Sequence, residues 1–154
     1  MYGVCFKSEH RGWMQDQWSW VFSNFGVTEI WERDVVAGTD AEIYQDVIHV
    51  DTAAQLPGNR PIVVLAPPDG KYVQGTESLK DFVHPDDAIY LFGATQNNLN
   101  DLDDFGGRVP DSLVYIPTVK LECYGHSAAY MTLWESMTKN KQRFLRGLAV
   151  SETP

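Results

Sequence analysis

The segment from Leu121 to Ser127 holds the closest group of reactive side chains in this sequence. It contains a carboxylate, a thiol, a phenol and an imidazole, on Glu122, Cys123, Tyr124 and His126. Histidine titrates near neutral pH, so His126 could accept a proton, or it could begin a helix and bond the local backbone. Cys123 has no partner at a spacing diagnostic of a nucleophile, which favours a packing role. Glu122 is either a base or a solvated loop acid.

A second polar group follows the apolar run 88–93. Gln96, Asn97 and Asn98 offer amide donors and acceptors without charge. They could hydrogen-bond an adenine edge or a ribose, or they could form an Asx-rich turn. Gly93 would let a ligand or another backbone approach closely, or would serve only as a turn glycine.

Cysteine and histidine are too scattered here to predict a metal site. The four histidines show no ligand pairing, and Cys5 and Cys123 stand far apart without a CxxC pair. Two such cysteines make no disulfide framework, so we expect a reducing compartment. A charge at Lys7 comes too soon for a signal peptide, and no apolar run approaches transmembrane length. We therefore expect a cytoplasmic protein with no metal and no membrane contact.

The chain is acidic, with 154 residues, a formal net charge of −9 and a pI of about 4.7. This balance argues against a broad electropositive face for nucleic acid. A local basic patch remains an alternative near the C-terminus, at Lys139, Lys141, Arg143 and Arg146. The other interpretation of this run is a solvated helix face or tail.

The hydrophobic pattern alternates short strands with helices. Apolar runs predict strands over 2–6, 27–31, 47–50, 61–66, 88–93 and 113–117. Helical spacing predicts helices over 13–25, 76–83 and 127–139 and a helical turn over 51–56, and Gly26 suits the left-handed position after the first helix. This alternation predicts one α/β domain over 1–146, with a mostly parallel sheet and helices on both faces. A tail over 147–154 would be disordered or docked on a partner.

Aromatic residues crowd the first helix and its flanks, at Trp13, Trp18, Trp20, Phe22, Phe25 and Trp31. Such crowding is typical of a core or a subunit interface, and the alternative is a platform on which bases stack.

Three predicted strand ends lead into unusual loops, at 65–70, 92–99 and 116–126. Ligands of parallel α/β sheets collect at the carboxyl ends of the strands. The last two loops lack a strong helix start directly after the strand, which is typical of loops that wrap a ligand.

These segments together resemble the SpoU branch of the SPOUT class of methyltransferases. Residues 88–99 resemble the family's second motif, a strand ending in Phe-Gly and then a Gly-Leu pair, with Asn98-Leu99 at the pair. Residues 116–135 resemble its third motif, a strand ending in Ile-Pro, a loop, and a small-residue helix closing on an aromatic-Glu pair. The helix over 13–25 and the turn after it resemble the family's opening helix and Phe-Gly turn. The match follows the family's order over nearly the whole chain.

The resemblance implies a C-terminal trefoil knot, in which the chain from about residue 113 passes through a loop formed near residues 66–98. It implies that S-adenosylmethionine (AdoMet) is bound in the knot, largely by backbone groups. Carried over by position, the cofactor-binding residues are Leu65, Ala66, Gly93, Ala94, Ile116, Leu121 and Cys123. Gly93 and Ile116 are then expected on adjacent strands.

The resemblance also implies partners. The family dimerises through its first and last helices, which would place Trp13, Trp18 and Trp134 in a homodimer interface. Structured RNA would be the substrate, and transfer to the ribose 2′-oxygen would be the reaction of this branch.

Several family positions carry other residues here. The opening motif's Asn and catalytic Arg fall near Met14 and Trp20, and the closest basic residue is Arg11. The second motif's Glu falls on Thr95, and the third motif's Asn falls on Tyr124 or His126.

Because the family's catalytic residues are replaced here, other side chains of this sequence would have to take their roles. Methyl transfer requires AdoMet held in line with a nucleophile and a base for its proton. His126 or Tyr124 could be that base, and Arg11, with His10 and Glu9, could orient the substrate.

Two functions remain open. The first is an AdoMet-dependent RNA methyltransferase with divergent catalytic motifs. The alternative is a catalytically inactive module of the same fold that binds AdoMet or a nucleoside, or another protein. A flavodoxin-like nucleotide-binding domain is disfavoured because the sequence holds no GxGxxG and no GxxxxGK[ST].

Overall fold

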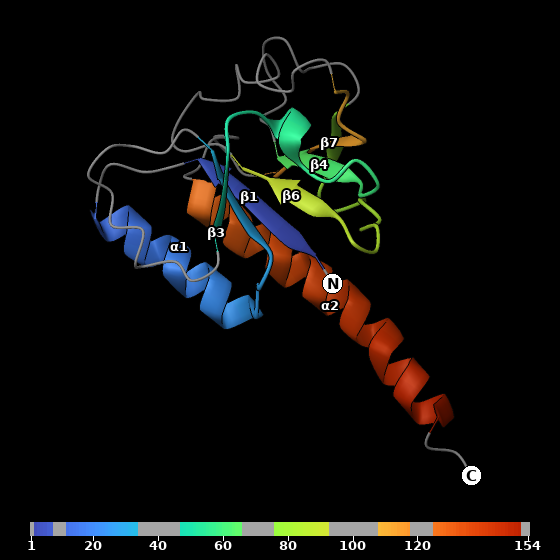
Figure 1. Ribbon diagram of the computed structural model, residues 1–154. Coiled ribbons are helices and arrows are strands. Elements are labelled where there is room, and N and C mark those ends of the chain that lie inside the picture. The colour runs from blue at the N-terminus through green and yellow to red at the C-terminus, as the bar shows by residue number, and fades with distance from the viewer. Residues whose placement is uncertain are drawn as a thin grey trace.

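Short strands alternate with helices along the chain, as the hydrophobic pattern predicts. The computed structural model describes residues 2–7, 12–33, 47–65, 76–92, 108–117 and 125–151, and their side chains except at 7, 12–14 and 141–151. In order the elements are β1 (Gly3–Lys7), α1 (Gly12–Phe25), β2 (Ile30–Arg33), β3 (Val47–Val50), η2 (Ala53–Gln55), β4 (Ile62–Leu65), β5 (Thr76–Ser78), β6 (Ile89–Leu91), β7 (Ser112–Tyr115) and α2 (Gly125–Ser151). Figure 1 shows both α-helices on one side of the sheet, with the C-terminal part of α2 extending beyond it.

The strands form one seven-stranded sheet in the order β3-β2-β1-β6-β4-β7-β5. Every neighbouring pair is parallel, which confirms the predicted α/β class. The two central strands β6 and β4 are buried at every position, because both of their faces are covered. Covered parallel strands are continuously apolar, and this is the pattern that predicts them in the sequence.

The strand order contradicts the expectation that Gly93 and Ile116 lie on adjacent strands. The strand before Gly93 is β6 and the strand before Ile116 is β7, and each of them pairs with β4. β4 therefore separates them. Sequence order does not predict this arrangement, because a crossover can place a strand beyond its nearest neighbour.

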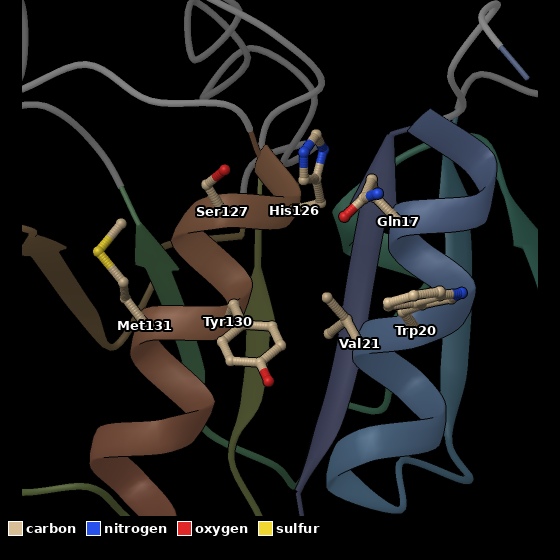
Figure 2. Close-up of a pocket in the computed structure, with 7 residues that line it drawn as sticks. All are labelled: Gln17, Trp20, Val21, His126, Ser127, Tyr130 and Met131. Carbon is tan, nitrogen blue, oxygen red and sulfur yellow. The ribbon is translucent and has the colours of Figure 1, made fainter. Parts of the chain in front are cut away.

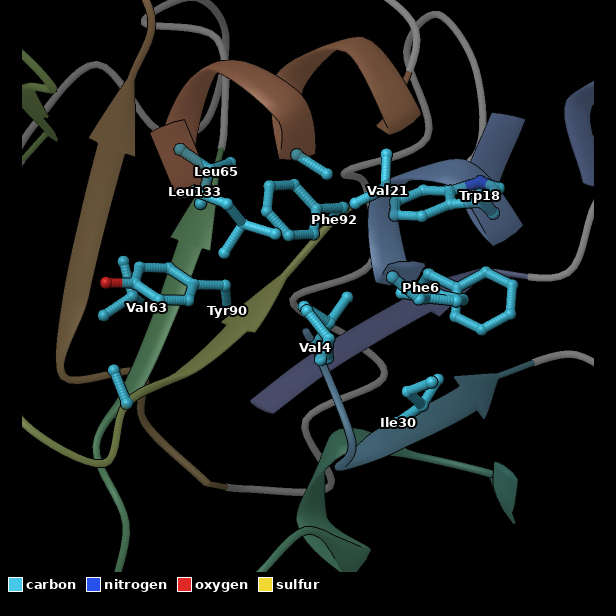
Figure 3. Close-up of a cluster of buried hydrophobic side chains, with 14 of the residues drawn as sticks. Val4, Phe6, Trp18, Val21, Ile30, Val63, Leu65, Tyr90, Phe92 and Leu133 are labelled. Atoms are coloured by element: carbon cyan, nitrogen blue, oxygen red, sulfur yellow. The ribbon is translucent and has the colours of Figure 1, made fainter. Parts of the chain in front are cut away.

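The sheet has two apolar faces, since successive side chains of a strand point to opposite sides. Val4 pairs with Ile30 and Tyr90, and all three belong to the cluster that packs against α1 and α2. The next residue, Cys5, belongs to the cluster on the other face, which packs against η2. Figure 3 shows the helix-side cluster, whose labelled members are Val4, Phe6, Trp18, Val21, Ile30, Val63, Leu65, Tyr90, Phe92 and Leu133.

Helix α1 sends two tryptophans to opposite environments. Residues two positions apart on an α-helix point about 200° apart, so Trp18 and Trp20 cannot share a face. Trp18 is fully buried and its ring lies 5.0 Å from that of Phe6 and 5.9 Å from that of Phe92, while Trp20 is 66% exposed. The expectation that Trp18 faces a second subunit is therefore wrong, because this ring fills the core of its own chain.

Gly26 ends α1 as the sequence predicts. Its φ is +61°, and the Val27 N–H donates to the Phe22 carbonyl across it at 2.9 Å. This left-handed residue satisfies a carbonyl that the end of the helix would leave without a partner. The turn directs the chain into β2.

The segment 76–83 is not the helix that the sequence predicts. Residues Thr76 to Ser78 form the edge strand β5, which pairs with β7, and the Leu79 N–H continues the pairing to the Tyr115 carbonyl at 2.8 Å. Pairing with a neighbouring strand outweighs the local helical pattern here. Helix α2 is also longer than the predicted 127–139, and it continues to Ser151 within the expected tail.

A polar cluster around the buried His84 fixes α2 against the sheet. His84 Nδ1 lies 2.7 Å from the Tyr90 hydroxyl, and its Nε2 lies 3.0 Å from Glu135 Oε1 on α2. Lys139 Nζ donates to the same carboxylate at 2.7 Å and to the Phe82 carbonyl at 2.8 Å. These bonds hold the middle of α2 at one height along the sheet, which sets where its first turn lies.

The two tryptophans of α1 should differ in their effect on stability. We expect Trp18→Ala to lower the free energy of unfolding by about 3–5 kcal/mol, because it leaves a cavity beside Phe6 and Phe92. Trp20→Ala should change it by less than about 0.5 kcal/mol in the monomer. Urea unfolding followed by circular dichroism measures both values, and equal losses would contradict the assigned burial.

Candidate functional site

The carboxyl ends of β6, β4 and β7 lie side by side at one edge of the sheet. Leu65 is the last residue of β4 and is 5% exposed, and its register partner on β7 is Val114. Ile116 follows β7 directly and packs, partly buried, against the helix-side cluster. The structure thus brings these two expected cofactor residues to neighbouring strands at the edge where ligands of such sheets bind.

The remaining expected site residues, apart from His126, lie outside the described part of the chain. These are the cofactor-binding residues Ala66, Gly93, Ala94, Leu121 and Cys123 and the catalytic residues Tyr124 and Arg11. Their positions follow β4, β6 and β7 in the sequence or precede α1 and α2.

Phe92 is the residue from which the chain continues into Gly93, and its backbone is held on both sides. Its N–H donates to the Cys5 carbonyl at 3.0 Å, and its carbonyl accepts from Arg33 Nη2 at 3.1 Å. The guanidinium of Arg33 is fully buried, and its charge acts on the Cys5 thiol. Burial raises the pKa of the Cys5 thiol to about 12, so it remains protonated at neutral pH.

Arg33 is absent from the residues that the sequence singles out. Its signal is a charged residue in the last position of a short strand, after the apolar residues Ile30 and Trp31 and the charged Glu32. A charged strand end is common at a surface, so the sequence gives no reason to expect a buried guanidinium there.

His126 stands in the first turn of α2 and is 8% exposed. Its ring meets that of Trp18 edge to face, with 6.4 Å between the centroids. Burial disfavours the charged imidazole and lowers the pKa of His126 below its ordinary value of 6.5. The side chain is therefore neutral at physiological pH and able to accept a proton.

A groove of about 340 Å³ lies between the first turns of α2 and the middle of α1. Figure 2 shows His126 and Gln17 on facing sides at one end of it, with Val21 directed from α1 toward α2. Its lining residues are Gln17, Trp20, Val21, His126, Ser127, Tyr130 and Met131. The groove combines a neutral imidazole with an amide, a hydroxyl and exposed aromatic surface, which suits recognition of a polar aromatic group or of another protein surface.

Gln17, Ser127 and Tyr130 join His126 only through the packing of α1 on α2. Trp18 meets His126 nearer the start of both helices, and Phe25 meets Tyr130 edge to face at 4.9 Å further along both, so α1 and α2 run in the same direction. The sequence places these residues on two helices more than a hundred positions apart, and no spacing within either helix indicates that they meet.

Two further kinds of site were sought in the part of the chain that the structure describes. No group of three or more His, Cys, Asp or Glu residues there could hold a metal ion. None of the helices there is long and apolar enough to cross a membrane.

Comparison with known proteins identifies the fold. No protein-family model and no curated protein sequence matches the chain. Among solved structures it resembles TrmJ from Z. mobilis ZM4, with a TM-score of 0.69 and 10% identity, covering 88% of this chain and 68% of that one. It also resembles the A. aeolicus TrmH/SpoU tRNA modifying enzyme, with a TM-score of 0.67 and 10% identity over 92% of this chain and 76% of that one.

A third similar structure is an AdoMet-bound rRNA methyltransferase from Sinorhizobium meliloti, with a TM-score of 0.66 and 11% identity. The comparison covers 90% of this chain and 56% of that one. The chain likewise spans 65% of a methylase family protein from Haemophilus influenzae Rd KW20. The fold is that of the SpoU-type methyltransferase structures, and this confirms the fold class that the sequence resemblance implies.

The protonation of His126 should follow from its burial. We expect its imidazole to titrate below 6.5 in the folded protein and near 6.5 in the unfolded chain. The unfolded chain then binds more protons, so the stability contributed by the neutral side chain is complete above pH 6.5 and declines as the pH falls below it. NMR titration of the ring protons measures the pKa, and His126→Gln should remove this part of the decline. A midpoint at or above 6.5 would contradict the account.

Proposed function

We propose that this protein binds AdoMet and transfers its methyl group to RNA, as an RNA methyltransferase of the SpoU type. The observation that carries the proposal is the carboxyl edge of the sheet. Three segments expected to contact the cofactor leave three neighbouring strands there, β6, β4 and β7. Similar folds, one of them AdoMet-bound in its structure, support the same assignment.

The residues at this edge fit AdoMet. The cofactor joins a flat adenine and a sugar to a charged amino acid, so its site needs apolar walls and backbone hydrogen-bonding groups. Leu65 and Ile116 supply apolar side chains at the ends of two neighbouring strands. Phe92 supplies a fixed backbone position just before Gly93. Bound there, AdoMet would supply an electrophilic methyl group.

The chain's own residues would orient the RNA and take up a proton. A ribose hydroxyl must lose its proton as it attacks a methyl group, and a neutral imidazole can accept it. His126 is held neutral by burial and stands at the start of α2. We assign it the role of general base, with Tyr124 as the second candidate and Arg11 as the residue that orients the substrate. Ribose 2′-oxygen transfer is the corresponding specificity.

The proposed fold includes the C-terminal trefoil knot. The chain from about residue 113 would pass through a loop formed near residues 66–98, which brings 118–124 beside the segments after β4 and β6. An experimental backbone trace of 66–75, 93–107 and 118–124 would test whether the chain is knotted. A chain end that does not pass through the loop would contradict the knot.

Binding and transfer are separable by two substitutions. We expect wild-type protein to bind AdoMet in calorimetric titration, and Gly93→Val to abolish binding, because a branched side chain blocks close approach. His126→Ala should keep the affinity and lower methyl transfer to RNA by about 10²–10⁴-fold, since it removes only the proton acceptor. Transfer is measured with radiolabelled AdoMet and total RNA.

The outcomes separate the two candidate functions. Transfer that depends on His126 supports the methyltransferase. Binding without transfer to any RNA pool favours the inactive binding module, which stays an alternative because the family's catalytic Arg falls near Trp20 in this sequence. No binding at millimolar AdoMet would contradict both.

The exposed aromatic face of α1 and α2 supports a homodimer. Trp20, Tyr130 and Trp134 are 66%, 46% and 57% exposed. Large exposed aromatic surfaces on a small protein mark interaction sites. We propose that a second copy of this chain covers this face. Trp20 would then lie in the homodimer interface, where the sequence analysis expected Trp18.

Charges placed on this face should disrupt the dimer. We expect the wild type to sediment as a dimer at micromolar concentration, and Trp20→Asp or Trp134→Asp to shift it to monomer. Val109→Asp is the matched control, because Val109 is 80% exposed and stands three residues before β7 and outside both helices in the sequence. A wild type that sediments as a monomer would refute the interface.

A further inference from the structure

Two arginines hold the backbone at the two ends of the central strand β6. Arg60 Nε donates to the Asp87 carbonyl at 2.9 Å, two residues before β6 begins. Arg33 Nη2 donates to the Phe92 carbonyl at 3.1 Å, one residue after β6 ends. Both bonds are charge-assisted and stronger than those between neutral backbone groups.

The two contacts differ in their surroundings. Arg60 is also paired with the Glu29 carboxylate and lies over the Trp31 ring, with 5.6 Å to its centroid. It stands at the amino edge of the sheet, opposite to the edge where ligands bind. Arg33 is fully buried and stands at the carboxyl edge, next to Cys5 of β1. Its bond therefore acts on the backbone from which the segment after β6 departs.

A buried guanidinium at this place is costly, since a charge loses hydration on burial. A strand end needs no such group to remain paired, because the Phe92 N–H is already bonded to the Cys5 carbonyl at 3.0 Å. The bond from Arg33 to the Phe92 carbonyl adds something else. It fixes the direction of this carbonyl, and with it the peptide group of Phe92. Backbone groups bind ligands well only when they are held in place beforehand.

We infer that Arg33 is a positioning residue for ligand binding: it fixes the Phe92 peptide so that the backbone after β6 is set to bind AdoMet. This inference rests on the proposed function. Arg33 does not touch the cofactor in this account, and it acts through the backbone of Phe92 across β1.

The test measures the dissociation constant of S-adenosylhomocysteine, the demethylated product, by calorimetry well below each variant's unfolding temperature. We expect Arg33→Met to weaken binding by tenfold or more, since methionine fills similar space without a donor. Arg33→Lys keeps one charged donor and should recover part of the affinity. It also provides a milder variant if Arg33→Met does not fold.

Arg60→Met is the matched control. It removes a charged donor from the other end of the same strand, so it should lower the unfolding temperature while changing the dissociation constant by less than about twofold. A purely structural role of Arg33 would make the two arginine variants alike in binding.

The outcomes are distinct. Weaker binding in both Arg33 variants, with Arg60→Met at wild-type affinity, supports the inference. Wild-type affinity in Arg33→Met, or in Arg33→Lys if only that variant folds, overturns it and leaves the proposed function intact. Equal weakening by Arg60→Met overturns it too, and a wild type that does not bind overturns the proposed function together with this inference.

Discussion

The parallel direction of all seven strands is the constraint on which the rest of this structure depends. Because all seven described strands are parallel, they end at the same edge, and each return to the other edge must be made by a crossover. Helices α1 and α2 therefore run in the same direction on one face, and the first turn of α2 meets the middle of α1 through His126 and Trp18. That meeting creates the groove that holds His126, close to the edge from which the three expected cofactor segments depart.

Four of the cationic side chains that the structure describes hold backbone carbonyls. Arg33 and Arg60 bond the two ends of β6, Arg108 bonds three carbonyls between Leu56 and Arg60, and Lys139 bonds the turn after β5. Each of these bonds joins segments far apart in the sequence and leaves less positive charge for a polyanion. If the protein acts on RNA, recognition would have to use shape and a small number of local contacts, since a broad basic surface is not what these side chains form.

The sequence predicts the class of fold well, because parallel central strands are apolar along their whole length and are separated by helical periodicity. It predicts Gly26 as a helix end for the same kind of local reason. It fails at 76–83, where pairing of β5 with β7 decides the structure, and at the order of β6, β4 and β7, which depends on crossovers. At the candidate site, the sequence suggested His126 from its chemistry and Leu65 and Ile116 from a family resemblance, and their roles stay predictions. Trp18 was misassigned, and Arg33 and Gln17 were missed, because the direction of a side chain depends on packing between distant elements.

The central claim is that backbone groups at the carboxyl ends of β4, β6 and β7 bind AdoMet. The most direct measurement follows the backbone amide resonances of ¹⁵N-labelled protein while AdoMet is added. The account predicts saturable shifts for the amides near Leu65, Phe92 and Ile116, with little change at the amino edge near Arg60 and Ala88. Shifts confined to other regions, or none at millimolar AdoMet, would contradict it.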